Sequence, residues 1–309
     1  MNVSGETFGA GVAEAAGPVA PTRPYFWSLW RELWENRFVS VGPLVVACVV
    51  MIATLITSMV TLSRSVAKVA DPQLSDVHSA AFKGFSIAPA PIMFASFLIG
   101  FFYCIDALYG ERRDRSILFW KSLPLSDRTV VLAKMSIPMM ILPLIALALS
   151  IAVQAILLLF TTVALGASGV SIAEVWGRLK FFYGIPIMVY GLAVHALWFA
   201  PIYGWFLLVS SWSRRAPVVW AVLPVLAIGA VERIVFDSSH FAKLLGYRMT
   251  GAMKEAFDFK SKAQEGDVDH YSQLLVTNFL ATPGLWLGLA FAAVCLALAV
   301  RMRQLREPV

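Results

Sequence analysis

The stretch Gly110 to Lys134, GERRDRSILFWKSLPLSDRTVVLAK, lies between two apolar runs, 88–109 and 131–165, each long enough to cross a lipid bilayer. A strongly basic segment between two spans predicts a compact loop at a membrane surface. Residues 111–115 are charged, residues 117–120 are apolar, and the polar Ser116 and Lys121 bracket this apolar patch. An apolar patch left beside water predicts contact with a protein partner, and insertion of the patch into the membrane interface is the alternative. The patch consists of Ile117, Leu118, Phe119 and Trp120.

The composition of the whole chain indicates an integral membrane protein. Of the 309 residues, 59% are apolar and 14% are charged, and the mean hydropathy is +0.74. Soluble domains have about 45–50% apolar and about 25% charged residues. The net charge of +6 does not indicate nucleic-acid binding, because the basic residues cluster at the ends of apolar runs, where lipid headgroups and topology account for them.

The N-terminal region predicts a disordered arm followed by a helix in the membrane interface. Residues 1–22 are rich in Gly, Ala and Pro and lack the pattern of a cleavable signal peptide, so we expect a disordered cytoplasmic arm. Trp27, Trp30 and Trp34 then recur at helical spacing, with polar residues on the other face. A soluble helix packed on a core has the same pattern, but a span follows at once, and this favours an amphipathic helix with tryptophans at headgroup depth.

Six apolar runs approach or exceed the roughly 20 residues that a helix needs to cross a bilayer. We therefore predict an all-α integral membrane protein whose residues 23–309 form one six-span domain without a nucleotide-binding domain. The third and fourth runs contain pairs of prolines, which predict kinks. The expected spans are 38–62, 88–109, 131–165, 183–211, 218–236 and 279–300, and the prolines are Pro138, Pro143, Pro186 and Pro201.

The distribution of Lys and Arg predicts the orientation. With a cytoplasmic N-terminus, the inner segments hold thirteen basic residues and the outer segments ten, five of which lie in a long loop where charge counts for less. An even number of spans then places both termini in the cytoplasm. We expect the chain to lie in the inner (plasma) membrane of the cell. The longest outer connection, 237–278, mixes apolar and charged residues irregularly. This pattern predicts short helices on the outer surface.

Motifs for catalysis and for metal binding are missing from the sequence. There is no P-loop pattern for nucleotide phosphates, no HExxH helix and no GxSxG turn. The three cysteines, Cys48, Cys104 and Cys295, all lie in apolar runs and form neither a CxxC metal motif nor a disulfide framework. We therefore expect no cofactor, no metal and no enzyme activity in this chain.

Polar residues within spans are candidates for a transport pathway or for helix contacts, because charge in hydrocarbon is costly. These candidates are Asp106, Gln154, His195 and Glu232. An ordinary structural role is open for each of them. Asp106 could form an ion pair at the membrane edge, Gln154 and His195 could form hydrogen bonds between helices, and Glu232 could lie in the interface.

Segment 110–134 also resembles a known family. An acidic residue with basic neighbours, an apolar turn, the run Ser122-Leu123-Pro124-Leu125-Ser126 and further basic residues lead into a long span. This order is similar to the stretch between the second and third spans of permeases of the type-2 ATP-binding-cassette exporter family. The predicted topology resembles that family over nearly the whole chain. One departure is that the family loop often carries a glycine before the apolar turn, where this chain has Arg115-Ser116.

The resemblance implies a cytoplasmic coupling helix between spans two and three that docks on an ATPase. It implies two separate ATPase subunits, which bind ATP and Mg, and a second permease that is a copy or a homologue. Proline after Leu123 and a helix cap at Ser126 or Asp127 agree with two helical pieces joined at a corner. The residues that the resemblance implies for coupling are Glu111, Arg112, Arg113, Ile117, Leu118, Phe119 and Trp120.

Two other functions are open at this point. A membrane-embedded enzyme, such as a lipid-modifying transferase or a protease, needs polar catalytic groups at one depth, and the spans have few. A non-transporting scaffold or sensor would use the long outer connection as its binding surface. The identity of a cargo does not follow from the sequence, since surfaces that face lipid and surfaces that face a pathway have similar composition.

Overall fold

The computed structural model describes residues 24–66, 85–117, 125–166, 173, 176, 181–258 and 274–305. About 91% of this part of the chain is helical, and it contains no sheet; one isolated bridge joins Phe257 and Leu274. The helices are α1 (Pro24–Glu35), α2 (Phe38–Val66), α4 (Pro89–Arg113), α6 (Asp127–Ser136), the π-helix η1 (Ile137–Ile141), α7 (Leu142–Gly166), α9 (Phe181–Trp212), α10 (Pro217–Phe236), α11 (His240–Ala256), α12 (Val276–Ala281) and α13 (Pro283–Leu305).

The prediction of six helices long and apolar enough to cross a membrane is confirmed. They cover Phe38–Val60, Phe85–Arg113, Asp127–Ala164, Phe181–Trp212, Pro217–Phe236 and Pro283–Leu305. The sixth begins at Pro283 instead of residue 279, since Thr282 is extended and divides α12 from α13. Proline disfavours a helical conformation in the residue before it and is itself well suited to the first turn of a helix.

The third span starts at a cap and contains a wide turn. Ser126 is the N-cap of α6, and its hydroxyl accepts a hydrogen bond from the Thr129 amide at 3.1 Å. The π-helix follows where Pro138 has no amide hydrogen to donate, and the amide of Leu142 donates to the carbonyl of Ile137, five residues earlier. Wide turns of this kind hold one residue more than an α-helical turn.

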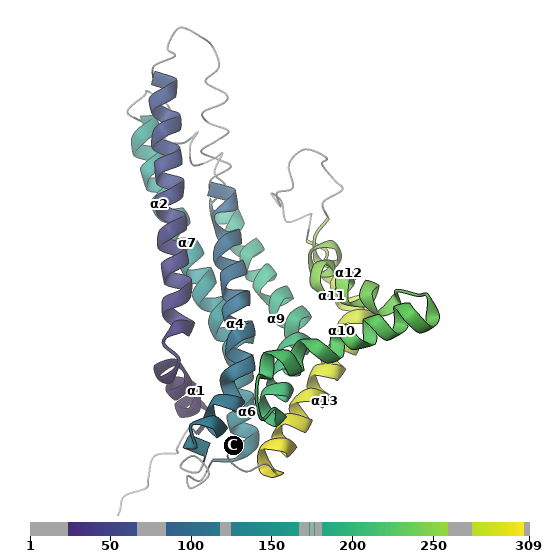
Figure 1. The fold of residues 1–309 in the computed structure, drawn as a ribbon. Helices are drawn as coiled ribbons and strands as arrows, with labels where there is room; N and C mark the ends of the chain where they lie inside the picture. The colour runs from purple at the N-terminus through teal and green to yellow at the C-terminus, as the bar shows by residue number, and fades with distance from the viewer. Residues whose placement is uncertain are drawn as a thin grey trace, which may run out of the picture.

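α9 lies at the centre of the bundle. It packs closely on α13, where a Cβ atom added to Gly204 would lie 3.3 Å from the Cα atom of Ala292. Tyr203 and Leu207, on the same helix, are fully buried in the largest apolar cluster. In Figure 1, α2, α4, α7 and α9 stand side by side, while α10 and α11 lean away from them.

We distinguish two ends of the bundle and name each after one of its helices. At the α1 end, α1 meets the last turn of α4, α6 and the last turns of α13. The α11 end is the opposite one, where α11, α12 and the first turns of α13 meet (Figure 1). Apolar residues of α9, α11, α12 and α13, among them Trp198, Ala256, Phe279 and Leu285, form the core of the α11 end.

Candidate functional site

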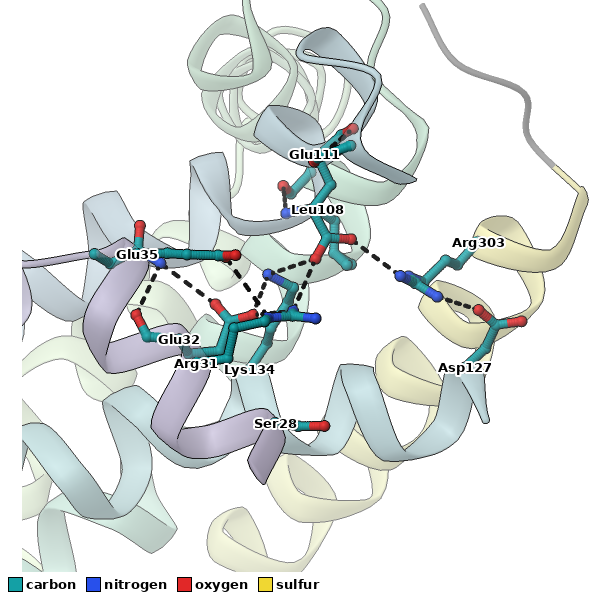
Figure 2. A network of polar contacts seen from close by, with 12 residues as sticks. Ser28, Arg31, Glu32, Glu35, Leu108, Glu111, Asp127, Lys134 and Arg303 are labelled. Carbon is teal, nitrogen blue, oxygen red and sulfur yellow. Dashed lines mark hydrogen bonds and ion pairs between the residues drawn. The ribbon is translucent and has the colours of Figure 1, made fainter. Parts of the chain in front are cut away.

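Glu111, the first charged residue of segment 110–134, lies at the centre of a set of ion pairs at the α1 end (Figure 2). Its carboxylate is 7% exposed and contacts three basic side chains from three helices. One oxygen lies 3.2 Å from Nη2 of Arg31 in α1 and 3.1 Å from Nζ of Lys134 in α6. The other oxygen accepts a hydrogen bond from Nη2 of Arg303 in α13 at 3.1 Å. Glu111 therefore connects the end of α4 to α1, α6 and α13.

A second buried carboxylate, Glu32, extends the set into α1. Its side chain is 1% exposed, and it accepts hydrogen bonds from Nζ of Lys134 at 2.9 Å, from Nη2 of Arg31 at 2.6 Å and from the hydroxyl of Tyr103 at 2.8 Å. Lys134 thus lies between Glu32 and Glu111. Burial raises the pKa of Glu32, but the positive charges and hydrogen bonds of Lys134 and Arg31 outweigh burial and hold the pKa below its ordinary value.

Arg303 joins the two ends of the segment between α4 and α6. Its Nη2 binds Glu111 at the end of α4, and its Nη1 donates to the carboxylate of Asp127, the first residue of α6. We call Arg31, Glu32, Glu111, Asp127, Lys134 and Arg303 the charge network. It contains three carboxylates and three basic side chains, and a fourth carboxylate, the exposed Glu35, lies 3.6 Å from Nε of Arg31 at its edge. Buried charges are tolerated when they are paired and hydrogen-bonded in this way.

Arg112 is also buried, and it faces the end of α9. Its Nη2 donates to the carbonyl oxygens of Ser210 at 2.8 Å and Ser213 at 2.6 Å. The hydroxyl of Ser210 in turn accepts from the amides of Leu108 and Tyr109 at 3.0 and 2.9 Å. An arginine that binds the last carbonyls of a helix satisfies acceptors that have no partner within that helix. Arg112 therefore fastens α4 to α9.

The remaining residues expected to dock a partner divide between surface and interior. Arg113 is 52% exposed, with its guanidinium 3.5 Å from Asp106 and 3.0 Å from Asp114. Ile117 is buried. Arg115, which lies between Arg113 and Ile117 in the sequence, has φ of 58°, in the left-handed region that favours glycine. The expected coupling helix, including Leu118, Phe119 and Trp120, lies outside the described residues.

The three tryptophans of α1 point away from the bundle. Trp27, Trp30 and Trp34 are exposed, whereas Ser28 and Glu32, on the opposite face, are buried against the protein. The helix thus turns its polar side inward, to the charge network, and its aromatic side outward. This is the arrangement expected of a helix whose outer surroundings are apolar, and its position in a membrane interface stays a prediction.

Each polar residue singled out in the spans has a partner within the chain. Asp106 lies beside Arg113, as given above. The amide Nε2 of Gln154 donates to the carbonyl of Phe85 at 3.3 Å, and Nε2 of His195 lies 3.1 Å from the hydroxyl of Tyr203. No hydrogen bond or ion pair joins any of these residues to another of the set in the part of the chain that the structure describes.

Glu232, the last of that set, caps α11. Its carboxylate accepts hydrogen bonds from the amides of His240 and Phe241 at 2.6 and 2.8 Å and from the hydroxyl of Ser238 at 2.7 Å. A carboxylate on the free amides of a first helical turn stabilises that helix. The contact holds the start of α11 next to the end of α10.

The sequence contained only a partial signal for the charge network. Lys134 lies inside the predicted third span, where an ionisable residue is expected to have a specific partner. Glu32 follows the buried Ser28 by four residues, which places both on one face of α1. Lys134 and Glu32 are 102 positions apart along the chain, and Arg303 and Glu111 are 192 apart, and no local pattern identifies such distant pairs.

The described residues of the site offer paired charges. Among the residues that the structure describes, no three His, Cys, Asp or Glu side chains are grouped to hold a metal ion. No family model matches this chain, and comparisons with curated proteins and with solved structures find no match.

Proposed function

We propose that the chain is the membrane permease subunit of a type-2 ATP-binding-cassette exporter, coupled through segment 110–128 to separate ATPase subunits. The observation that supports this most is that Arg303 binds both ends of the segment, Glu111 at its start and Asp127 near its end. The two ends of the segment are thus tied to each other through one side chain of α13. A force applied to it therefore reaches α1, α6 and α13 through their ion pairs.

In this proposal the residues of the segment have two different roles. Glu111, Arg112 and Ile117 are buried within the chain, so they hold the segment in place instead of contacting an ATPase. Arg113 is exposed and is available to a partner. The apolar Phe119 and Trp120 would fill a groove on the ATPase, as large aromatic side chains do at the centres of protein interfaces.

The proposed cycle needs partner chains. Two ATPase subunits bind ATP and Mg and close, the 110–128 segments of two permeases shift, and the spans open alternately to the two sides of the membrane. The α1 end and both termini then face the cytoplasm, and α1 lies in the inner leaflet with its tryptophans among the lipids. Neither ATP hydrolysis nor any other catalysis is assigned to this chain.

The experiment first searches the reading frames next to that of this chain for the G-x-x-x-x-G-K-[ST] pattern, and then tests co-purification of the encoded ATPase with this chain. We expect Arg113→Glu and Trp120→Asp each to weaken association and permease-stimulated ATP turnover about tenfold or more, as loss of a central interface contact does. Arg233→Glu is the matched control, since Arg233 is also an exposed arginine beside an aspartate, Asp237 at 3.2 Å, but lies outside the segment. Unchanged association and turnover in the first two variants would overturn the proposal.

A further inference from the structure

α11 carries an arginine at the boundary between a buried and an uncovered stripe. Residues three and four apart lie on one face of a helix. On the face that contains Arg248, Gly251 and Ala252 are buried against the bundle, whereas Leu244 and Leu245, one turn earlier, are exposed. Arg248 therefore lies where the packed part of α11 gives way to an open apolar part.

The guanidinium of Arg248 is inserted between α9 and α13. It lies 4.6 Å from the centre of the Trp198 ring, and its Nη1 donates to the carbonyl of Gly284 at 3.1 Å. The indole of Trp198 donates to the Arg248 carbonyl at 2.7 Å. Gly288 makes this position possible, because a Cβ atom there would lie 1.9 Å from Nη2. The arginine is thus held by a ring, a carbonyl and a glycine, none of which is an anion.

Two donors of this guanidinium have no acceptor. Nε and Nη2 are shielded from solvent, and neither forms a hydrogen bond. No carboxylate pairs with Arg248 in the part of the chain that the structure describes. Burial lowers the pKa of this guanidinium, against a smaller opposing effect of Tyr247. A shielded cation without an anion is costly, and an oxyanion that binds it relieves the cost.

The Nε and Nη2 hydrogens form one edge of the planar guanidinium, and that edge matches the two oxygens of a carboxylate or a phosphate. The exposed Leu244 and Leu245 next to it suit a hydrocarbon chain. We propose that Arg248 binds the anionic head of an amphiphile, a phosphate or a carboxylate, whose chain lies along the uncovered stripe of α11. The site goes beyond the proposed function and does not depend on any ATPase.

Binding requires a small movement of α11. In this structure Nε and Nη2 are covered, so the head reaches them when α11 moves away from α13 at Gly288. The surroundings allow such a movement, because α11 and the preceding α10 are exposed along most of their length.

The test uses the full chain, purified in a neutral detergent and titrated with four probes while native mass spectrometry counts bound molecules. Phosphatidylglycerol is compared with phosphatidylcholine, and oleate with oleyl alcohol, so that each pair shares its hydrocarbon part and differs in the net charge of its head. We expect tighter binding of at least one anionic probe than of its partner, by about tenfold, which corresponds to about 1.4 kcal/mol. Preference for phosphatidylglycerol identifies a lipid phosphate, and preference for oleate a carboxylate.

The variants assign the effect to one residue. R248Q should abolish the preference, and R248K should reduce it several-fold, because lysine keeps the charge but lacks the flat two-donor edge. G288A, which places a methyl group where the guanidinium lies, should act like R248Q. R233Q, which removes an arginine that already pairs with Asp237, should bind like the wild-type chain.

Two results would overturn the inference. One is equal binding of the anionic probes and their net-neutral partners by the wild-type chain, and the other is an unchanged preference in R248K and R248Q. Size-exclusion profiles and circular dichroism identify variants that fail to fold. If R248Q does not fold, the binding preference of R248K alone tests the inference.

Discussion

The two ends of the bundle treat buried charge in opposite ways. At the α1 end, three carboxylates and three basic side chains pair with one another across four helices. At the α11 end, Arg248 is shielded and has no acidic partner in the described residues. The α1 end is therefore held by its own ion pairs, whereas Arg248 at the α11 end keeps donors for a ligand.

The largest expected effect comes from removing the central carboxylate of the α1 end. Glu111→Gln leaves Arg31, Lys134 and Arg303 with one anion fewer in a buried site, and loss of one partner of such a pair costs about 3–5 kcal/mol. Unfolding in detergent by titration with a denaturing surfactant measures the change. Glu232→Gln, which affects a partly buried helix cap at the start of α11, should have a much smaller effect. Similar losses in the two variants would remove the contrast between the ends.

The coupling of Glu32 to Lys134 is the next largest effect. Glu32→Gln and Lys134→Met should each destabilise the chain strongly, while the double variant should lose less than the sum, with a coupling of about 1–3 kcal/mol. A double-mutant cycle of unfolding free energies gives this value. The exposed pair of Arg233 and Asp237, treated in the same way, should show almost none. Additive losses for Glu32 and Lys134 would mean that they act separately.

Acid should destabilise the folded chain through the α1 end. The pKa of Glu32 in the folded chain lies below its ordinary value. Its stabilisation is therefore complete above the unfolded-state pKa, about 4.3, and is lost as the pH falls through the lower folded value. Thermal unfolding midpoints from pH 7 to pH 3 should be flat down to about pH 5 and then fall. Glu32→Gln should show a shallower acid decline, and a decline that begins near pH 6.5 would point to histidine instead.

The smallest expected effect is a gain in stability. Arg115 adopts φ of 58°, which costs a side-chain-bearing residue about 1 kcal/mol relative to glycine. Arg115→Gly should therefore raise the unfolding free energy by up to about 1 kcal/mol. Ala216→Gly, at φ of 46°, is a second site for the same test. Loss of stability in Arg115→Gly would show that the arginine side chain makes a contact worth more than the strain.

The sequence predicted the spans well because their signal is local. Runs of about 20 apolar residues identify a crossing helix without knowledge of its neighbours. Errors occurred at the ends, as at Pro283, where an apolar run continues across a break in the helix. The cap at Ser126 was predictable for the same reason, since the capping residue and the amide it accepts from are three positions apart.

The sites could be predicted only in part. Glu111 and Arg112 were identified because they stand in a charged segment, but the same pattern suggests a surface, and the structure buries both side chains. Their partners come from other helices and depend on how these pack. Arg248 had no distinguishing pattern in the sequence at all. It became notable only when its surroundings showed two donors without acceptors.

The wide turn at Ile137–Ile141 has a consequence for how this chain tolerates changes in length. It lies directly between Lys134, which belongs to the charge network, and the apolar α7. Because the turn holds one surplus residue, removing Pro138 would leave an ordinary helix with Lys134 and α7 still facing their neighbours. A single deletion elsewhere in the span would rotate one part of the helix by about 100° against the other. This short stretch is therefore the place where evolution or an engineer can shorten the third span at least cost.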